Sequence, residues 1–506
     1  MFLGVERSGH PVAEFLPVDP FDLVIVGATG SLSKTKLLPA LYHRFCDGQI
    51  NSISRIVGVA QTEFADGEFQ NFVKAACIDD CDTRFSEKKW QGFQRLLHYR
   101  CLDASADLAE WANVKSILAN DQRPRIFYLA LAPDIYVPVC NSIRQADLNN
   151  ASSRLVLEKP IGSDLKSAEI INDGVQLVFQ DNSIFRMDHY LGKETVQNLL
   201  VLRFANSLYE PLWNKNCIDH IQITVAETLG VADRASYYNR AGAVRDIVQN
   251  HILQILCLLT MEPPSSLSPA NIRQEKIKVL QSLHGFTPET VSSQTVKAQY
   301  ETGEVKGETV CGYRTDVASI DKNSNTETYV AVKTSIENWR WSGMPIYLRT
   351  GKRMASKRSE VMVQFKEPPH DLFSGVEKAP NKLVLSLQPN EGVKLFMQIK
   401  EPGPGGLKLR SLPLDLSFDR SFEAKTYPDA YERLLMDVVR GNLGLFMGHD
   451  EVAAAWNWTD NLLNVWDDVD QPLSYYSAGT DGPVVAQRLI ESDGRSWWND
   501  GLNINV

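Results

Sequence analysis

Five acidic, basic or phenolic side chains lie within the seven residues Asp188–Glu194, in the stretch Arg186–Glu194, which reads Arg-Met-Asp-His-Tyr-Leu-Gly-Lys-Glu. The residues before it predict a short strand and those after it a helix, so the stretch lies at a strand-to-helix junction. Backbone N–H groups at a helix start attract anions, and one helical turn would put His189 and Lys193 on one face. The pattern predicts a phosphate-binding site and leaves Asp188 available for another role. The alternative is a solvated helix start that Asp188 caps.

A second candidate is His251, on a helix predicted over residues 243–256. An apolar stripe along this helix consists of Val244, Val248, His251 and Ile255. His251 is therefore either a buried core residue or a general base. In an α-helix Asp246 would lie about 140° around the axis from His251, so the two could not pair. A working base would then need a carboxylate from elsewhere, and Asp188 is the natural supplier.

A third candidate is a glycine turn near the N-terminus. The apolar strand Asp22–Gly27 runs into Gly27-Ala-Thr-Gly30-Ser-Leu-Ser-Lys34, and a helical period follows. Strand, glycine turn and helix form the context of a dinucleotide-binding turn, although G-x-x-G alone is a weak signal. Further apolar strands at 55–60, 125–131 and 153–159 alternate with helical stretches, which predicts a Rossmann-type parallel sheet over 21–204.

In such domains the residue at the end of the second strand selects the cofactor. An acidic residue there binds a ribose 2′-hydroxyl, whereas an arginine accommodates a 2′-phosphate. Here the end of the predicted strand reads Gln61-Thr62, which leaves both a 2′-hydroxyl and a 2′-phosphate possible. Pro133 and Pro160 each follow a strand, which indicates loops at the ligand-binding edge of the sheet. Lys159 is therefore either a ligand contact or a surface lysine.

The chain from 205 to 506 is different in pattern. Several segments alternate with period two: 221–227, 329–333, 361–365, 383–387 and 393–399. With helices at about 240–261, 429–440 and 449–457, they predict one large α+β domain on a broad, mainly antiparallel sheet. One-sided alternation leaves a sheet face that a homodimer would cover. The loop after 346–351, with Lys352, Lys357 and Arg358, is either a second anion clamp or a solvated basic turn.

Composition limits the class of protein. The 506 residues carry a net charge of −10 without a basic block, which argues against a nucleic-acid partner. Eight scattered cysteines lack metal-site spacing, so we expect no metal and a reducing, cytoplasmic location. The longest apolar run, 252–261, is too short to span a bilayer. Residues 1–20 lack a clear period, and we expect an N-terminal arm.

Together these stretches resemble the glucose-6-phosphate dehydrogenase family over nearly the whole chain. The motifs that carry the resemblance are Gly27–Pro39, Glu158–Gly162, Arg186–Glu194, Arg245–His251, Met261–Pro264, Asn338–Trp341, Arg349–Lys352 and Pro428–Arg433. The segment 186–194 is highly specific. The resemblance implies oxidation of D-glucose 6-phosphate at C1 to 6-phospho-D-glucono-1,5-lactone, with hydride transfer to NADP, the entry step of the pentose phosphate pathway. For the oligomeric state we expect a homodimer or a dimer of dimers.

The resemblance also implies roles for individual residues. It makes His251 the base that takes the C1 hydroxyl proton and Asp188 the carboxylate that orients it and stabilises the imidazolium. The substrate contacts that it implies are Lys159, His189, Tyr190, Lys193, Glu227, Asp246, Lys352 and Lys357, of which His189, Tyr190 and Lys193 would hold the 6-phosphate. The cofactor contacts that it implies are Gly27, Ala28, Thr29, Gly30, Ser31, Leu32, Gln61, Pro133, Tyr136 and Lys159.

Two positions depart from the family pattern. An arginine that grips the 2′-phosphate is common where Gln61 stands, and its loss removes a contact worth roughly 1.5–3 kcal/mol. Ser31 replaces a usual aspartate. We therefore expect NADP use with appreciable NAD use. Two other hypotheses are a dehydrogenase of the same architecture for another sugar or sugar phosphate, and a non-catalytic nucleotide sensor.

Overall fold

The computed structural model describes residues 15–81, 85–105, 108–118, 123–231, 234–373, 375–404, 406–418 and 428–499. The chain divides into two compact units, each assembled from separate parts of the sequence. The first unit comprises Met1–Lys159, Ile171–Gly192 and Phe422–Phe446, and the second comprises Pro160–Ile170, Lys193–Ser421 and Met447–Val506. Most of the predicted arm, 1–20, lies outside the described residues, and residues 15–20 form no helix or strand.

A seven-stranded sheet forms the centre of the first unit, in the order β17-β6-β5-β4-β1-β2-β3. Its strands are β1 (Asp22–Val26), β2 (Arg55–Ala60), β3 (Leu97–Cys101), β4 (Arg125–Leu129), β5 (Ser153–Leu157), β6 (Ile184–Met187) and β17 (Phe446–Met447). Strands β1 to β6 run parallel. Because β1 lies between β2 and β4, the strand order reverses there, and ligands of such sheets bind beyond the carboxyl ends of the strands at that point.

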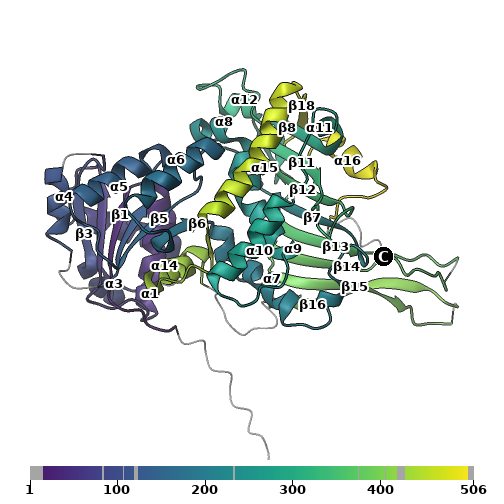
Figure 1. Cartoon of the computed structure of the whole chain (residues 1–506), viewed down its shortest axis with the longest axis horizontal. Helices are drawn as coiled ribbons and strands as arrows, with labels where there is room; N and C mark the ends of the chain where they lie inside the picture. Colours follow the sequence, from purple (N-terminus) through teal and green to yellow (C-terminus); the bar gives the residue numbers. More distant parts are fainter. Residues whose placement is uncertain are drawn as a thin grey trace, which may run out of the picture. The chain divides into compact units, whose positions relative to one another are not determined.

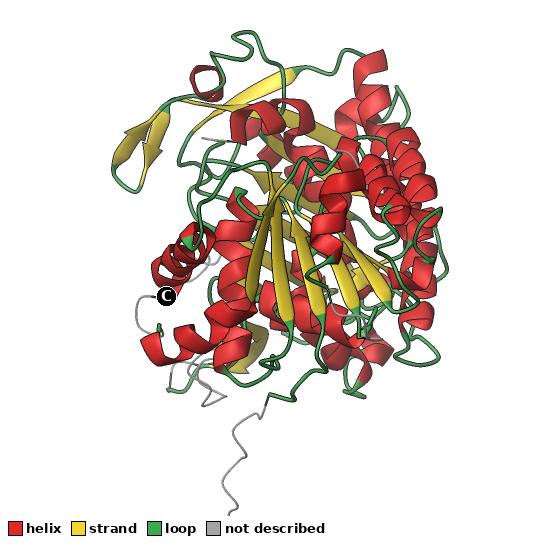
Figure 2. Cartoon of the chain, turned by 90° about the vertical axis from the view of Figure 1, so that its left-hand side faces the viewer, coloured by secondary structure: helices red, strands yellow, loops and turns green. Residues whose placement is uncertain are grey.

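Helices cover both faces of this parallel sheet (Figure 2). The helices of this region are α1 (Leu38–Cys46), α2 (Glu68–Cys81), α3 (Glu87–Phe93), α4 (Leu108–Lys115), α5 (Tyr136–Gln145), α6 (Leu165–Gln176) and α14 (Ala430–Arg440). All five residues of β1 are buried, as are those of β4, which explains their uninterrupted apolar sequences. The predicted Rossmann-type architecture is confirmed.

Helix α14 packs in the first unit although it lies about 240 residues after β6 in the chain. Its Leu434 and Leu435 belong to the same core cluster as Leu41 of α1. Glu432 of α14 accepts a hydrogen bond from His43 Nδ1 at 2.9 Å and forms an ion pair with Arg44 at 2.6 Å. Both contacts are buried, so this helix is an integral part of the first unit.

A nine-stranded sheet forms the centre of the second unit, in the order β16-β15-β14-β13-β7-β12-β11-β8-β18. Its strands are β7 (Ile218–Ala226), β8 (Thr295–Glu301), β11 (Tyr329–Thr334), β12 (Ile346–Gly351), β13 (Arg358–Phe365), β14 (Lys382–Gln388), β15 (Gly392–Lys400), β16 (Leu409–Ser417) and β18 (Leu473–Ser477). β7 pairs parallel with β12, and β8 with β18, whereas the other neighbours are antiparallel. The predicted mainly antiparallel sheet is confirmed. A separate hairpin joins β9 (Gly303–Val305) to β10 (Glu308–Val310).

Figure 1 shows helices over one face of this sheet. The helices of the second unit are α7 (Glu194–Phe204), α8 (Ala235–Ala243), the π-helix η8 (Val244–Ile252), α9 (Leu253–Thr260), α10 (Pro269–Gln281), α11 (Val291–Gln294), α12 (Tyr313–Asp316), α15 (His449–Asp468) and α16 (Val484–Glu491). Among the described residues, no helix is both long and apolar enough to cross a membrane.

The expectation of a sheet with one open face is wrong for the central strands. Residues 220–226 of β7 are all buried, because the C-terminal segment covers their second face. Trp498 N donates to Gln222 Oε1 at 2.8 Å, and the Arg349 guanidinium lies 4.4 Å from the Trp497 ring centroid. The outer strands β15 and β16 keep exposed apolar side chains, namely Met397, Ile399, Leu412, Leu414 and Leu416.

Candidate active site

The glycine turn of the first unit is held in place by hydrogen bonds of its backbone. Gly27 has a φ of +93°, in the region that favours glycine. Its N–H donates to Val59 O at 2.8 Å, and its carbonyl accepts from Gly30 N at 3.1 Å and from Ser33 Oγ at 2.9 Å. The helix that follows begins at Ser31. A glycine turn at a helix start, beyond the carboxyl end of β1, fits a pyrophosphate group.

Replacing Gly27 with alanine should lower the free energy of unfolding by roughly 2–4 kcal/mol. A Cβ on Gly27 would lie 2.4 Å from the Ala130 carbonyl oxygen, in addition to the cost of the positive φ. Gly48→Ala is the matched control, since Gly48 has a φ of +75° but open space around its Cβ position. It should lose only about 1–2 kcal/mol. Equal losses in urea unfolding of the two variants would contradict the importance of this close approach.

Polar side chains gather at the end of β2. Gln61 Nε2 donates to Asp103 Oδ2 at 2.9 Å, and Asp103 itself follows β3. The hydroxyls of Thr29 and Thr62 lie 3.1 Å apart, which links this strand end to the glycine turn. Gln61 therefore stands, exposed, where side chains of this domain type contact the ribose 2′ position.

Pro133 begins the 3₁₀-helix η3 (Pro133–Ile135), which leads into α5. Tyr136, the first residue of α5, is buried, and its hydroxyl donates to the backbone carbonyl of Glu158 at 2.9 Å. The Glu158 side chain is buried as well and accepts a hydrogen bond from Tyr128, and its burial raises its pKa to about 6. Tyr136 thus fixes the backbone next to Lys159, which is partly exposed.

Asp188 directly follows β6 and is completely buried. Its Oδ1 accepts a hydrogen bond from Tyr190 N at 2.9 Å, so it caps the short 3₁₀-helix η5 (His189–Gly192). The His189 ring stacks on Tyr431 of α14, with centroids 6.0 Å apart and an angle of 12° between the planes. The cap and the stacked ring hold both side chains of this motif in defined orientations.

The predicted single helical turn from His189 to Lys193 is wrong. The 3₁₀-helix ends at Gly192, and Lys193 has an extended backbone (φ −74°, ψ 136°) before α7 begins at Glu194. The prediction failed because it assumed that the α-helical period of 194–204 begins upstream of Lys193.

His251 lies in the second unit, on the π-helix η8, which follows a break at Gly242 (φ +67°). It is almost fully buried, as is Asp246. Hydrogen bonds of a π-helix join residues five apart, so Asp246 and His251 lie about one turn apart on the same side. The expectation that Asp246 lies 140° away is therefore wrong, because it assumed α-helical geometry.

Three predicted substrate contacts, Glu227, Asp246 and Lys352, come together in the second unit. Glu227 and Lys352 directly follow β7 and β12, which are parallel neighbours, so both leave the same edge of the sheet. Lys352 Nζ donates to Glu227 Oε2 at 2.5 Å and lies 3.9 Å from Asp246 Oδ2. The Tyr237 hydroxyl donates to Asp246 at 3.4 Å. A buried lysine between two carboxylates is suited to hydroxyl groups, which both donate and accept hydrogen bonds.

Comparison with known families decides which protein class carries this arrangement. The family model for the glucose-6-phosphate dehydrogenase NAD binding domain matches residues 24–198, and that for the C-terminal domain matches residues 200–498. The chain belongs to the glucose-6-phosphate dehydrogenase family.

Individual members of the family match over their full length. The chain is 48% identical over 494 residues to the glucose-6-phosphate 1-dehydrogenase of Rhizobium meliloti, covering 97% of this chain and all of the relative. It is 50% identical over 491 residues to that of Mycolicibacterium smegmatis, covering 95% and 98%. A solved glucose-6-phosphate dehydrogenase in complex with its substrate glucose-6-phosphate has a TM-score of 0.87 at 30% identity, covering 96% of this chain and all of the other.

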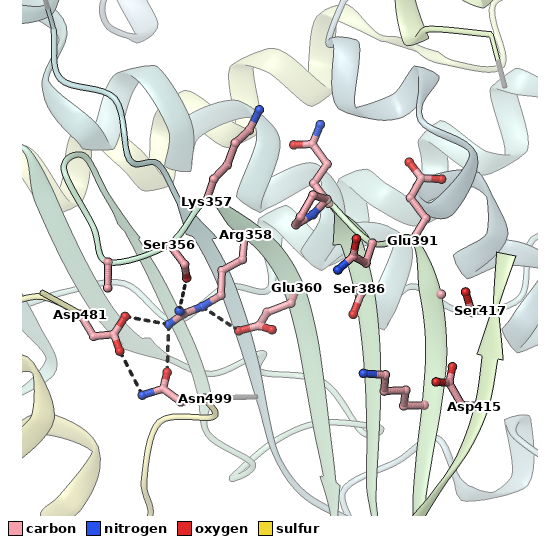
Figure 3. A pocket seen from close by; sticks show the side chains of 16 residues that line it. Ser356, Lys357, Arg358, Glu360, Ser386, Glu391, Asp415, Ser417, Asp481 and Asn499 are labelled. Atoms are coloured by element: carbon pink, nitrogen blue, oxygen red, sulfur yellow. Dashed lines mark hydrogen bonds and ion pairs between the residues drawn. The ribbon is translucent and has the colours of Figure 1, made fainter. Parts of the chain in front are cut away.

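Lys357, another position implied by the glucose-6-phosphate dehydrogenase family, lines a different part of the second unit. It borders a cavity of about 660 Å³ (Figure 3). Its side chain extends away from Arg358, which pairs with Glu360 and Asp481. The structure thus groups Lys352 with Glu227 and Asp246, and places Lys357 at this cavity.

Sequence reasoning missed three tyrosines that contact the predicted residues. Tyr237 donates to Asp246, the Tyr238 ring lies 4.9 Å from Lys352 Nζ, and Tyr431 stacks on His189. Tyr431 belongs to a motif matched to the glucose-6-phosphate dehydrogenase family, which was the available signal. Tyr238 carries no local signal, since Lys352 lies far along the chain. Tyr237 lies only nine residues before Asp246, but the break at Gly242 and the π-helix between them hide the contact from α-helical spacing.

Proposed function

We propose that the chain oxidises D-glucose 6-phosphate at C1 to 6-phospho-D-glucono-1,5-lactone, the entry step of the pentose phosphate pathway. The observation that carries this proposal is the similarity to glucose-6-phosphate 1-dehydrogenases over nearly the whole chain, at 48% and 50% identity. A bound nicotinamide dinucleotide would accept the hydride from C1. The glycine turn, from Gly27 to Leu32, would hold its pyrophosphate, with Pro133, Tyr136 and Lys159 nearby.

In this proposal His251 takes the proton from the C1 hydroxyl, which develops the C1 carbonyl of the lactone. A neutral imidazole is suited to this step near pH 7. Asp188 orients the ring and stabilises the imidazolium. The burial of both side chains supports these roles, because electrostatic effects on a proton transfer are larger away from water.

The substrate contacts are divided between the sugar and its phosphate. Glu227 and Asp246 accept hydrogen bonds from sugar hydroxyls, and Lys352 donates while it neutralises the two acids. The residues proposed to hold the 6-phosphate are His189, Tyr190 and Lys193, with Lys159 and Lys357 as further contacts. Fixing the phosphate at one end of the sugar would hold C1 in place for the base.

The cofactor proposal is NADP with appreciable use of NAD. Gln61 is uncharged and exposed at the position where a cationic side chain would bind a 2′-phosphate. Its amide can hydrogen-bond a phosphate or a hydroxyl, so we expect only a modest preference.

An absorbance assay at 340 nm tests the function. Purified protein with glucose 6-phosphate should reduce NADP and, at a comparable rate, NAD. Glucose, fructose 6-phosphate and 6-phosphogluconate serve as a substrate panel. A higher kcat/KM for one of these compounds would replace the proposed substrate, and no reduction with any of them would refute a dehydrogenase.

Replacing Lys352 with methionine should raise the KM for glucose 6-phosphate roughly 10- to 100-fold, the loss of one charged hydrogen-bond donor. The kcat should fall less, because Lys352 binds substrate and transition state alike. Lys333→Met is the matched control, since Lys333 also pairs with a carboxylate, that of Asp493, at 2.7 Å. A Lys352→Met enzyme with unchanged KM would contradict the assigned contact.

We propose that the chain forms a homodimer, alone or within a dimer of dimers, through the outer strands of the large sheet. The support is the group of exposed apolar side chains on β15 and β16, since monomers rarely expose large apolar patches. Sedimentation velocity at micromolar concentration should show a species of at least twice the chain mass. Leu414→Lys should dissociate it, and a monomer in the unmodified protein would refute the proposal.

A cytoplasmic location is part of the proposal. All seven cysteines whose side chains are described are free thiols, which suits a reducing compartment.

A further inference from the structure

The carboxylate of Asp103 is held in one orientation beside Gln61. Its Oδ1 accepts hydrogen bonds from the N–H and the hydroxyl of Ser105, at 2.9 Å and 2.7 Å. Its Oδ2 accepts from Gln61 Nε2 at 2.9 Å. The bonds from Ser105, and then the bond from Gln61, lower the pKa of Asp103 below its usual value. Asp103 is therefore negatively charged at neutral pH.

The charge of Asp103 determines which way the Gln61 amide points. A carboxylate only accepts hydrogen bonds, so the amide nitrogen of Gln61 faces Asp103 and the amide oxygen points away from it. The backbone on both sides is anchored, because the Tyr99 hydroxyl contacts the carbonyls of Ala60 and Thr62, at 3.2 Å and 2.5 Å. A ligand at the end of β2 therefore meets an amide oxygen with a carboxylate one hydrogen bond behind it.

We propose that Asp103 is a specificity-determining residue that disfavours the 2′-phosphate of NADP and so moves the cofactor preference toward NAD. This inference rests on the proposed dinucleotide-dependent function. A phosphate monoester carries a charge of about −1.5 to −2 at pH 7, so the Asp103 carboxylate repels it. A free 2′-hydroxyl is neutral and can donate to the Gln61 amide oxygen, whereas a phosphate dianion has no proton to donate.

The test uses 2′,5′-ADP and 5′-AMP, which represent the adenosine halves of NADP and NAD. Isothermal titration calorimetry measures their Kd values with the full-length protein and with Asp103→Asn. The variant should bind 2′,5′-ADP about three- to tenfold more tightly, the size expected for exposed charges a few ångströms apart. Its affinity for 5′-AMP should stay within about twofold. In 0.5 M NaCl the gain should largely disappear, because salt screens exposed charges.

Two further variants separate charge from structure. Asp147→Asn removes one negative charge elsewhere in the first unit, where Asp147 is exposed and pairs with Lys115 at 2.8 Å. Asparagine also tolerates the positive φ of this position, +50°, so neither Kd should change. Asp103→Glu keeps the charge and should keep the ratio of the two Kd values, whereas Asp103→Ser should raise the relative affinity for 2′,5′-ADP even if Asp103→Asn fails to fold.

The outcomes distinguish this inference from the proposed function. If the unmodified protein binds both probes and the neutral variants leave their ratio unchanged, Asp103 has no role in specificity and the proposed function stands. A gain that persists in 0.5 M NaCl would reflect altered structure rather than charge, and it would also overturn the inference. If neither probe binds the unmodified protein, the dinucleotide site itself is refuted, and the inference with it.

Discussion

His251→Asn should lower kcat by about 10³-fold or more while the Kd for glucose 6-phosphate stays within about threefold. General-base catalysis contributes typically 10²- to 10⁴-fold, and asparagine cannot accept a proton at neutral pH. Its side chain still fills much of the same space and retains polar atoms, so the buried surroundings of residue 251 should remain intact.

Steady-state kinetics and calorimetric binding of glucose 6-phosphate measure the two quantities separately. The matched control is His220→Asn in β7 of the same unit. His220 is equally buried and has a carboxylate partner, Asp219, at 2.7 Å. This control should retain substantial turnover. If His251→Asn keeps more than a tenth of the normal kcat, and the kcat of His220→Asn falls to the same extent, residue 251 is not the base.

Asp188→Asn should lower kcat by about 10²- to 10⁴-fold, because an amide neither fixes the imidazole tautomer nor stabilises the imidazolium. The asparagine carbonyl can still accept the hydrogen bond from Tyr190 N, so the cap of η5 should survive. Loss of a nearby negative charge lowers the pKa of a histidine. The acidic limb of the kcat/KM profile should therefore move to lower pH.

A pH profile from 5 to 9 measures this shift, which a merely structural role of Asp188 would not produce. Asp181→Asn is the control from the same region, since Asp181 pairs with the buried Arg186 at 2.9 Å. It should leave the profile in place. An unchanged acidic limb in Asp188→Asn, with kcat reduced less than tenfold, would refute the orienting role.

The parallel sheet and its glycine turn could be predicted because their signals are local. The residues of β1 form an uninterrupted apolar run, and Gly27 follows at once. The predicted strand at 55–60 coincides with β2, since a buried parallel strand needs apolar side chains on both faces.

The path of the chain after β16 could not be predicted in the same way. A helix at 429–440 was expected and α14 (Ala430–Arg440) forms, but no local pattern indicates that it packs in the first unit. Glu432 reads in the sequence as one more helix-surface acid. Its partners, His43 and Arg44, lie nearly 390 residues earlier, and pairing over such a separation leaves no mark on sequence periodicity.

The candidate site was likewise only partly predictable from the sequence. Glu227 and Lys352 meet because β7 and β12 are parallel neighbours, although 125 residues separate the two side chains. Their types and their places at strand ends were visible in the sequence, whereas strand adjacency was not. The π-helical turn around Asp246 was also invisible, because an apolar stripe at α-helical spacing suggested an ordinary helix.

The π-helix has a consequence for how residues that share one side of a helix are recognised in sequences. A search for residues that face one another along a helix scans offsets of three and four. In a turn widened by one residue the offset becomes five, as from Asp246 to His251. Searches restricted to α-helical offsets would discard such pairs, although both side chains line the same side of the helix.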